Sequence, residues 1–442
     1  MATEISPRRA FRLGVGRLLD GTEGGRAIED AAILVVDGRI AAVGASATVP
    51  RPEDAATLDL PGTTALPGLM DAHVHVALPP TVDPLSSLDA ETDQDLVVRG
   101  TAAAERMVRA GITTAYDCGA RGMTAYAIRD AIERGLSLGP RLLVSGRPVT
   151  RTKGHCHFFG GEADGVDGVR EAVRRLLEDE GADGIKIMAT GGGLTPGTDS
   201  RHGSYSIPEL AAAADEAHRL GKLVTSHAHG VPGIDNASRA GIDSIQHCTM
   251  LGPNWEWTFD EAVARGMAER GTRAIPTISA GTRYEVETGG DINKLQPNPG
   301  AMTRADLWAN ARALYDTGVT IVPGTDVGIN YTDFGEDLFL ELEAWAGIGL
   351  DLAFVIHAAT GRAAWHLGIE RDTGTLRPGL AADVLVVDGA PDRDITDLRR
   401  TRFILKGGQR VQPTPPRPRP VRGHDAIPGE NAQARSGSGS AS

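Results

Sequence analysis

From about Pro67 to Ile369, short apolar segments typical of β-strands alternate with amphipathic segments typical of helices. One example is the helical pattern of residues 207–220, which leads into a strand-like segment. Alternation of this kind favours a parallel sheet whose strands are joined by crossover helices. Eight strand segments are present: one before His73, then 113–117, 141–145, 184–189, 222–226, 243–247, 273–277 and 320–323. Eight parallel strands match a closed barrel with its active site at the C-terminal strand ends.

Both ends of the chain carry short segments that are typical of a small all-β unit. Residues 31–36 and 40–43 flank Asp37-Gly38, and alternation around an Asp-Gly pair is a strong β-hairpin signal. A matching pattern returns at residues 380–388 and 402–408. We therefore predict an α/β fold, a (β/α)8 TIM barrel with a small β-sandwich domain formed by both chain ends. The expected division is a sandwich at 1–65 and 370–411, a barrel at 66–369, and a disordered, proline-rich tail at 412–442.

Charge and cysteine content restrict the partners and the compartment. The chain has 45 Lys and Arg against 58 Asp and Glu and no concentrated basic stripe, so we expect no nucleic-acid partner. Cys118, Cys156 and Cys248 do not suggest a disulfide framework, which fits a reducing compartment. No stretch of about 18 apolar residues occurs, and no apolar region follows the N-terminal arginines. We expect a cytoplasmic protein with no membrane partner.

His73 and His75 end the first barrel segment, directly after a Pro-Gly turn and an apolar run. Two histidines separated by one residue on a strand point to the same face, so both imidazoles can reach one metal ion. The adjacent Asp71 can orient an imidazole from behind, since metal-bound histidines usually donate their other N–H to an acceptor. Chance His-x-His pairs are common, and the metal interpretation depends on the ligands that follow.

Lys186 stands in an apolar strand segment that runs into a glycine-rich loop. Burying its charge is expensive, and a lysine in such a place commonly snorkels or pairs with a carboxylate. The functional alternative is a neutral amine that adds carbon dioxide and becomes a carbamate, whose two oxygens can bridge two divalent cations. Four histidines, one aspartate and that carbamate would complete a binuclear site.

Four more candidate side chains lie in or after later strand segments. His227 and His229 again share a face, and we expect the first to bind metal and the second to contact substrate. His247 would be the fourth imidazole, although a lone histidine after a strand is more often a core residue. Asp326 follows Gly324-Thr325 and is either a turn aspartate or the general base that passes a proton to the leaving amine. The residues expected to take part in catalysis are Asp326, His247 and His229.

The loop after the third strand carries a further His-x-His pair, His155 and His157, preceded by Arg151. These side chains either contact substrate or belong to a solvated loop. No Gly-x-Ser-x-Gly elbow stands out, and no Gly-Lys-Ser/Thr follows the glycines at 191–193, so a serine nucleophile and a phosphate loop are unsupported. The predicted substrate contacts are His155, His157, His229, Tyr205 and Arg151.

The chain resembles the amidohydrolase superfamily, with residues 67–75 similar to its first-strand motif and 324–326 similar to its last. The segments 184–192, 226–230 and 244–247 look like the branch of Xaa-Pro dipeptidases, metallo-carboxypeptidases and ochratoxin-hydrolysing amidases. The resemblance implies that carboxylated Lys186 bridges two divalent ions, expected to be zinc, and that a bridging hydroxide attacks the amide carbonyl. It further implies that one ion is held by His73, His75 and Asp326, and the other by His227 and His247. Relatives commonly assemble into oligomers, so we expect a homo-oligomer.

The chain departs from that branch in the loop after the third strand. The branch pattern there is Thr-Gly-Gly-His-Gly-His, whereas this chain has Thr152-Lys153-Gly154-His155-Cys156-His157. Bulkier residues at these positions can alter recognition of the substrate. Our leading hypothesis is a metal-dependent amidohydrolase acting on a dipeptide or an N-acyl amino acid. The alternatives are hydrolysis of a cyclic or secondary-metabolite amide, such as an ochratoxin-like compound, and a non-catalytic binding protein on the same scaffold.

Overall fold

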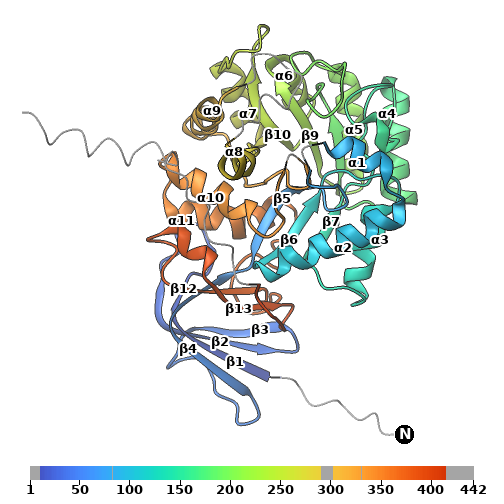
Figure 1. The fold of residues 1–442 in the computed structure, drawn as a ribbon. Coiled ribbons are helices and arrows are strands. Elements are labelled where there is room, and N and C mark those ends of the chain that lie inside the picture. The colour runs from blue at the N-terminus through green and yellow to red at the C-terminus, as the bar shows by residue number, and fades with distance from the viewer. Residues whose placement is uncertain (1–9, 82, 290–301, 330, 415–442) are drawn as a thin grey trace, which may run out of the picture. The chain divides into compact units, whose positions relative to one another are not determined.

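The computed structural model describes residues 10–81, 83–289, 302–329 and 331–414 (Figure 1). The chain forms two compact units. The first contains the described residues among Met1–Met70, Arg106–Thr114 and Asp351–Pro416, and the second contains those among Asp71–Glu105 and Ala115–Leu350. The predicted tail at 412–442 lies outside the described residues apart from its first three positions.

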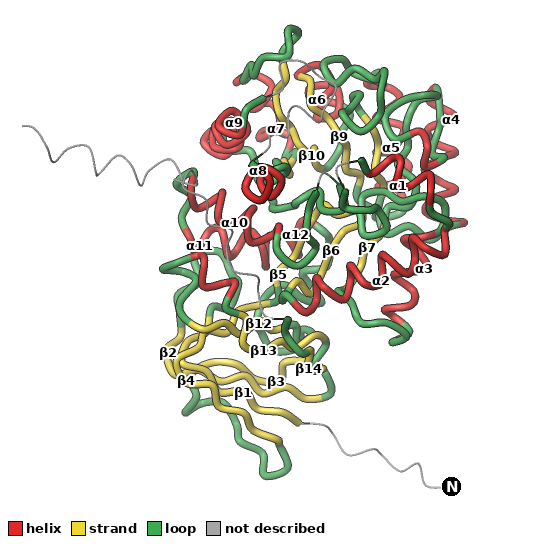
Figure 2. Tube along the Cα trace, in the orientation of Figure 1, coloured by secondary structure: helices red, strands yellow, loops and turns green. Residues whose placement is uncertain are grey.

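Strands from both ends of the chain form one seven-stranded sheet in the order β14-β13-β12-β4-β1-β2-β3 (Figure 2). The centre of this sheet is β4, which pairs parallel with β1 and antiparallel with β12. This pairing confirms the predicted β domain built from both ends. The seven strands are β1 (Ala10–Leu18), β2 (Ile28–Val36), β3 (Arg39–Ala45), β4 (Ala56–Pro67), β12 (Val384–Asp388), β13 (Thr401–Lys406) and β14 (Gln409–Val411).

The predicted hairpin joins β2 to β3 through a two-residue turn. Asp37 and Gly38 have φ angles of 50° and 80°, and positive φ at both central residues matches the right-handed twist of the flanking strands. Alternate residues of β2 then face the core, where Ile33 and Val35 pack in a cluster with Leu13 of β1. The period-two pattern read from the sequence therefore places one face of this sheet in the core.

The barrel strands form two sheets, β5-β6-β7 and β8-β9-β10-β11. Isolated parallel bridges complete the ring: Val149↔Ile187 joins the sheets, while Ala274↔Ile321 and Val74↔Val327 bring in the eighth segment. The eight-stranded barrel is confirmed, with its eighth segment present as isolated bridges, and Asp326 just after that segment has a left-handed φ of 60°. The strands are β5 (Leu69–Val74), β6 (Ile112–Asp117), β7 (Arg141–Val144), β8 (Ile185–Met188), β9 (Val224–Gly230), β10 (Ser244–Leu251) and β11 (Arg273–Ile275).

Helices alternate with these strands, and Figure 1 shows α4 and α5 on the outer side of β9. The predicted helix at 207–220 is α5, which begins at a capping box formed by Ser206 and Glu209 and buries Leu210 and Ala213. No helix of the described residues is long and apolar enough to cross a membrane. The helices are α1 (Pro84–Ala90), α2 (Asp93–Arg109), α3 (Thr124–Glu133), α4 (Gly165–Arg174), α5 (Ile207–Arg219), α6 (Val231–Arg239), α7 (Glu261–Arg270), α8 (Thr282–Thr288), α9 (Arg304–Asp316), α10 (Asp337–Gly347), α11 (Leu352–His357) and α12 (Ala363–His366).

Candidate metal centre

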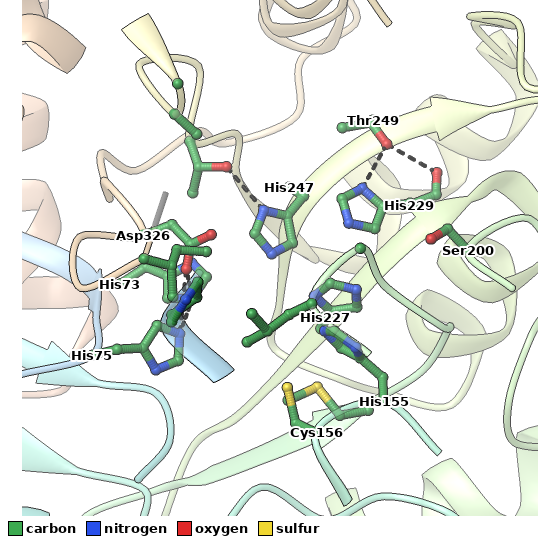
Figure 3. A pocket seen from close by; sticks show the side chains of 18 of the residues that line it. His73, His75, His155, Cys156, Ser200, His227, His229, His247, Thr249 and Asp326 are labelled. Carbon is green, nitrogen blue, oxygen red and sulfur yellow. Dashed lines mark hydrogen bonds and ion pairs between the residues drawn. The ribbon is translucent and has the colours of Figure 1, made fainter. Parts of the chain in front are cut away.

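His73, His75 and Asp326 converge at one side of the barrel mouth (Figure 3). The Nε2 atoms of the two imidazoles lie 3.3 Å apart, and they lie 3.2 and 3.3 Å from Asp326 Oδ1. Both histidines come from the end of β5, where residues two apart share a face. The second ring nitrogen of His75, Nδ1, hydrogen-bonds the carbonyl of Gly119 at 2.9 Å, which fixes its ring. Two imidazoles and a carboxylate in this arrangement form a donor set that suits a divalent transition metal.

Asp71 supports this cluster through the backbone. Its carboxylate accepts hydrogen bonds from the amides of His73 and Thr325, both at 3.1 Å, and from the Thr325 hydroxyl at 2.7 Å. The sequence-based expectation was a contact with an imidazole, whereas the carboxylate instead ties the strand carrying His73 to the segment carrying Asp326. Burial raises the pKa of Asp71 to about 7, against the effect of these hydrogen bonds. Asp71 therefore positions two of the candidate ligands.

His227 and His229 of β9 and His247 of β10 form a second cluster. A hydrogen bond orients each ring: His227 Nε2 to the Gly191 carbonyl at 3.0 Å, His229 Nδ1 to Thr249 Oγ1 at 3.1 Å, and His247 Nδ1 to Thr277 Oγ1 at 2.9 Å. Each bond leaves the other ring nitrogen available to a metal or a substrate. The ring of His247 lies 5.2 Å from that of His73 and 4.7 Å from that of His227, so it connects the clusters (Figure 3).

Lys186, from β8, lines the cavity that both clusters share. It is only 1% exposed, so it does not snorkel to solvent. Among the described residues its ammonium group also has no hydrogen-bond or ion-pair partner, which removes the second ordinary explanation for a buried lysine. Burial lowers the pKa of Lys186, although the charges of Cys118, Asp326 and Cys156 act in the opposite direction. A lowered pKa favours the neutral amine, the form that can react with carbon dioxide.

Burial favours the neutral form of most of the clustered imidazoles. Burial lowers the pKa of His73, His227 and His247 well below the usual value, and lowers that of His229 to about 4. For His75, burial acts downward but the hydrogen bond and charge of Asp326 outweigh it and raise the pKa. A positive charge on Lys186 would also lower the pKa of His73 and of His227, so this one side chain lies close to both clusters. Neutral imidazole is the form that binds metal.

The cavity above the two clusters has a volume of about 500 Å³. Apart from the candidate ligands, most of its wall is apolar, and His155 and Cys156 from the loop after β7 also line it. The ring of His155 lies 4.4 Å from that of His227. The structure thus brings the six predicted metal ligands, His155 and His229 to a single cavity. Its apolar lining includes Leu78, Leu85, Phe159, Leu194, Pro196, Leu251, Trp255, Met302 and Leu307.

Comparison with known proteins decides the family, because residues 64–411 match the model of the amidohydrolase family. The chain belongs to this family. It is 28% identical to an ochratoxinase of Aspergillus niger over 89% of this chain and 85% of that protein. It also matches a crystal structure of a Xaa-Pro dipeptidase with bound methionine, at 29% identity and a TM-score of 0.81, over 91% of this chain and 99% of the other. The crystal structure of the A. niger ochratoxinase gives 26% identity and a TM-score of 0.77, over 92% and 96% of the chains.

Three of the predicted substrate contacts of this amidohydrolase are not part of the described cavity wall. The Tyr205 hydroxyl donates a 2.7 Å hydrogen bond to the Ala163 carbonyl, and His157 Nδ1 bonds the Gly154 carbonyl at 3.0 Å. The guanidinium of Arg151 donates to the Ser204 carbonyl at 2.9 Å. All three side chains therefore have partners in the loops around the cavity, and a contact with substrate stays a prediction for each of them.

The loop in which the amidohydrolase departs from its branch pattern has an unusual backbone. Lys153 and Cys156 have φ angles of 58° and 57°, in the left-handed region that favours glycine. These are two positions at which the branch pattern has glycine. Cys156 lines the cavity whereas Lys153 is exposed, so the departure from the pattern changes the cavity wall at one position only.

Sequence reasoning missed several side chains that shape this site. Ser200, in the loop after β8, is 3% exposed and lines the cavity beside His229 and Thr249 (Figure 3). Glu341, in α10, is fully buried and accepts hydrogen bonds from the amides of Ile278 and Ser279 at 3.2 and 2.7 Å. It thereby holds the loop that carries Thr277, the partner of His247. A polar residue in an irregular loop and an acid in a helix gave no periodic signal that could have identified them.

We expect Glu341→Gln to destabilise the amidohydrolase by about 1–3 kcal/mol, because a glutamine amide leaves one of the buried N–H donors unpaired. Burial raises the pKa of Glu341 from 4.5 to about 7. The folded state therefore holds a proton that the unfolded state releases, and this contribution to stability is present below pH 4.5 and is lost as the pH rises to about 7. Urea unfolding across this range should show a smaller fall in the free energy of unfolding for the variant. If the free energy of unfolding depends on pH in the same way in the parent and in the variant, Glu341 is not the source of that dependence.

Proposed function

We propose that this protein is a binuclear zinc amidohydrolase that cleaves the amide bond of a dipeptide or an N-acyl amino acid. His73, His75 and Asp326 would hold one ion, and His227 and His247 the other. Carboxylated Lys186 would bridge them. The proposal is supported by the two convergent clusters, by membership of the family, and by the similarity to a Xaa-Pro dipeptidase and an ochratoxinase.

The single observation that carries the proposal is Lys186. A lysine that is 1% exposed, without an ion-pair partner among the described residues, and with its pKa lowered by burial has no structural explanation in this barrel. In its charged form this side chain would lower the pKa of imidazoles in both clusters, so it lies close to both. If Lys186 became a carbamate, its unfavourable buried amine would be replaced by an anion whose two oxygens could each bind a cation. The non-catalytic alternative is disfavoured because none of the six ligand types has been lost.

When bound, two divalent ions supply Lewis-acid polarisation of the substrate carbonyl and lower the pKa of water. The residues of the chain supply the rest. Asp326 has Oδ1 at the mouth of the cavity, where it can take a proton from the attacking water and pass it to the leaving amine. His229, with Nδ1 engaged by Thr249, presents Nε2 to the cavity and would hold the substrate carbonyl in place. The apolar walls exclude bulk water around the reacting groups.

A second candidate is hydrolysis of a secondary-metabolite amide, such as an ochratoxin-like compound. The observation that favours it is the 28% identity to an ochratoxinase over 89% of this chain, together with the apolar cavity wall. Both candidates share the metal centre and the cleaved bond, and they differ in the group that the cavity accepts. The cytoplasmic location and the homo-oligomer are further parts of the proposal.

The test is to incubate zinc-loaded protein with a library of dipeptides, N-acyl amino acids and ochratoxin-like amides, and to measure the released amino acid. The proposal expects release from dipeptides or N-acyl amino acids, and none by the Lys186→Ala variant. Release from the ochratoxin-like amides alone would move the assignment to the second candidate. If a protein that holds two metal ions hydrolyses none of these compounds, the first proposal is contradicted. The non-catalytic binding protein then becomes the favoured alternative.

A further inference from the structure

The hairpin after β10 carries a tryptophan into the cavity wall. Leu251 and Trp257 form an antiparallel bridge, and between them the chain turns so that Trp255 lines the cavity. The Trp255 amide donates to the Gly252 carbonyl at 3.2 Å, and its φ is 69°. A left-handed φ is a genuine outlier for a bulky side chain and is retained only where the surroundings fix it.

Arg201 holds the hairpin that carries Trp255. Its guanidinium lies 4.7 Å from the centre of the Trp255 ring, and it donates to the Pro253 carbonyl in the same hairpin at 2.7 Å. The Asp199 carboxylate holds this guanidinium through bonds of 3.0 and 2.8 Å. Arg201 therefore joins the loop after β8 to the hairpin after β10, and a cation over an indole face is attractive. The guanidinium covers one face of the Trp255 ring, and the rest of the ring can contact a ligand in the cavity.

We propose that Trp255 is a specificity-determining residue that stacks on an aromatic ring of the substrate, and that Arg201 is the positioning residue that holds it there. This inference rests on the proposed amide hydrolysis and names its substrate class: amides that carry an aryl group. Apolar side chains of the same two segments, Leu194, Pro196 and Leu251, line the cavity with Trp255 and suit such a ring. Aromatic pairs prefer stacked or edge-to-face geometries and gain free energy beyond that of area burial alone.

The experiment compares phenyl compounds with their saturated cyclohexyl counterparts, which keep the six-membered ring but lack the aromatic face. One pair, N-benzoylglycine and N-(cyclohexanecarbonyl)glycine, places the ring on the acyl side. The other, N-acetylphenylalanine and N-acetylcyclohexylalanine, places it on the amine side. In at least one pair we expect the parent to have a KM about two- to ten-fold lower for the phenyl compound, as stacking on an indole provides. Trp255→Leu should abolish this preference through KM rather than kcat, and Trp255→Phe should retain most of it.

Trp257 provides a matched control, because it lies in the same hairpin but is not among the described residues that line the cavity. Its indole nitrogen donates instead to Asn310 Oδ1 at 3.1 Å. Trp257→Leu should keep the phenyl preference. Arg201→Leu should weaken the preference and Arg201→Lys should restore part of it, whereas a merely structural arginine would not affect the ratio of the two KM values.

Calorimetry with the product pairs, benzoate against cyclohexanecarboxylate and phenylalanine against cyclohexylalanine, separates this inference from the proposed function because it needs no turnover. A phenyl preference that Trp255→Leu removes supports the stacking role even if the parent hydrolyses none of the amides. Hydrolysis without a phenyl preference in either pair, or with a preference that Trp255→Leu leaves unchanged, overturns it.

Discussion

Lys186→Ala is expected to remove most of the bound metal and to lower amide hydrolysis about a thousand-fold or more, since metal ions supply several kcal/mol of transition-state stabilisation. The side chain is 1% exposed and lines the cavity shared by both histidine clusters. Removing it removes the bridging ligand and leaves His227 and His247 to hold the second ion without a bridge. Metal content by elemental analysis and hydrolysis rate should therefore fall together.

Lys153→Ala is the matched control, because Lys153 is an exposed lysine in a loop that surrounds the cavity. This variant should retain both metal ions. A thermal unfolding curve of Lys186→Ala, measured without metal, should be close to that of the metal-free parent, since neither protein has a charged carbamate to stabilise. Full activity of Lys186→Ala with two ions retained would contradict the bridging role.

Asp326→Asn is expected to lower kcat by about 10²- to 10⁴-fold, the contribution of a positioned general base. Asparagine keeps the shape of the side chain and one oxygen near the imidazoles of His73 and His75, but it cannot accept a proton at neutral pH. The loss should therefore appear in kcat more than in KM. The informative measurement is steady-state kcat and KM for the parent and the variant, each with its metal content determined.

Asp83→Asn is the control for Asp326, because Asp83 is a second carboxylate that lines the same cavity and lies outside both clusters. Its side chain accepts from the amide of Ser86 at 3.1 Å and caps α1. The control should keep kcat within a few-fold of the parent. If both variants lost activity equally, the effect would belong to the charge of the cavity rather than to proton transfer by Asp326.

The positions of the candidate ligands could be predicted from the sequence because each lies in or shortly after an apolar strand segment. His73, Lys186, His227 and His247 lie within strands of a parallel barrel, and such strands deliver their C-terminal residues to one mouth. The same reasoning predicted the β domain, since the Asp37-Gly38 hairpin and the returning strands carry local signals. Where a local pattern determines the structure, the sequence was sufficient to place the residue.

The cavity wall could not be predicted in this way. Tyr205 is not among the described residues that line the cavity, and its hydroxyl donates to the Ala163 carbonyl, a contact between loops that no local sequence pattern indicates. Its contact with substrate stays a prediction. Trp255 was not identified, because its direction depends on a left-handed turn and on Arg201, more than fifty residues earlier. Long-range contacts between irregular loops carry no periodicity, so specificity is harder to infer than chemistry.

Native mass spectrometry of the zinc-loaded parent tests the central claim most directly. The account predicts a chain that carries two metal ions together with the mass of one carbon dioxide, and a Lys186→Ala variant that loses the carbon dioxide and most of the metal. Removing dissolved carbon dioxide during metal loading should leave the parent partly empty, and bicarbonate should restore it. A fully active parent that carries two metal ions but lacks the mass of one carbon dioxide would contradict the carbamate bridge.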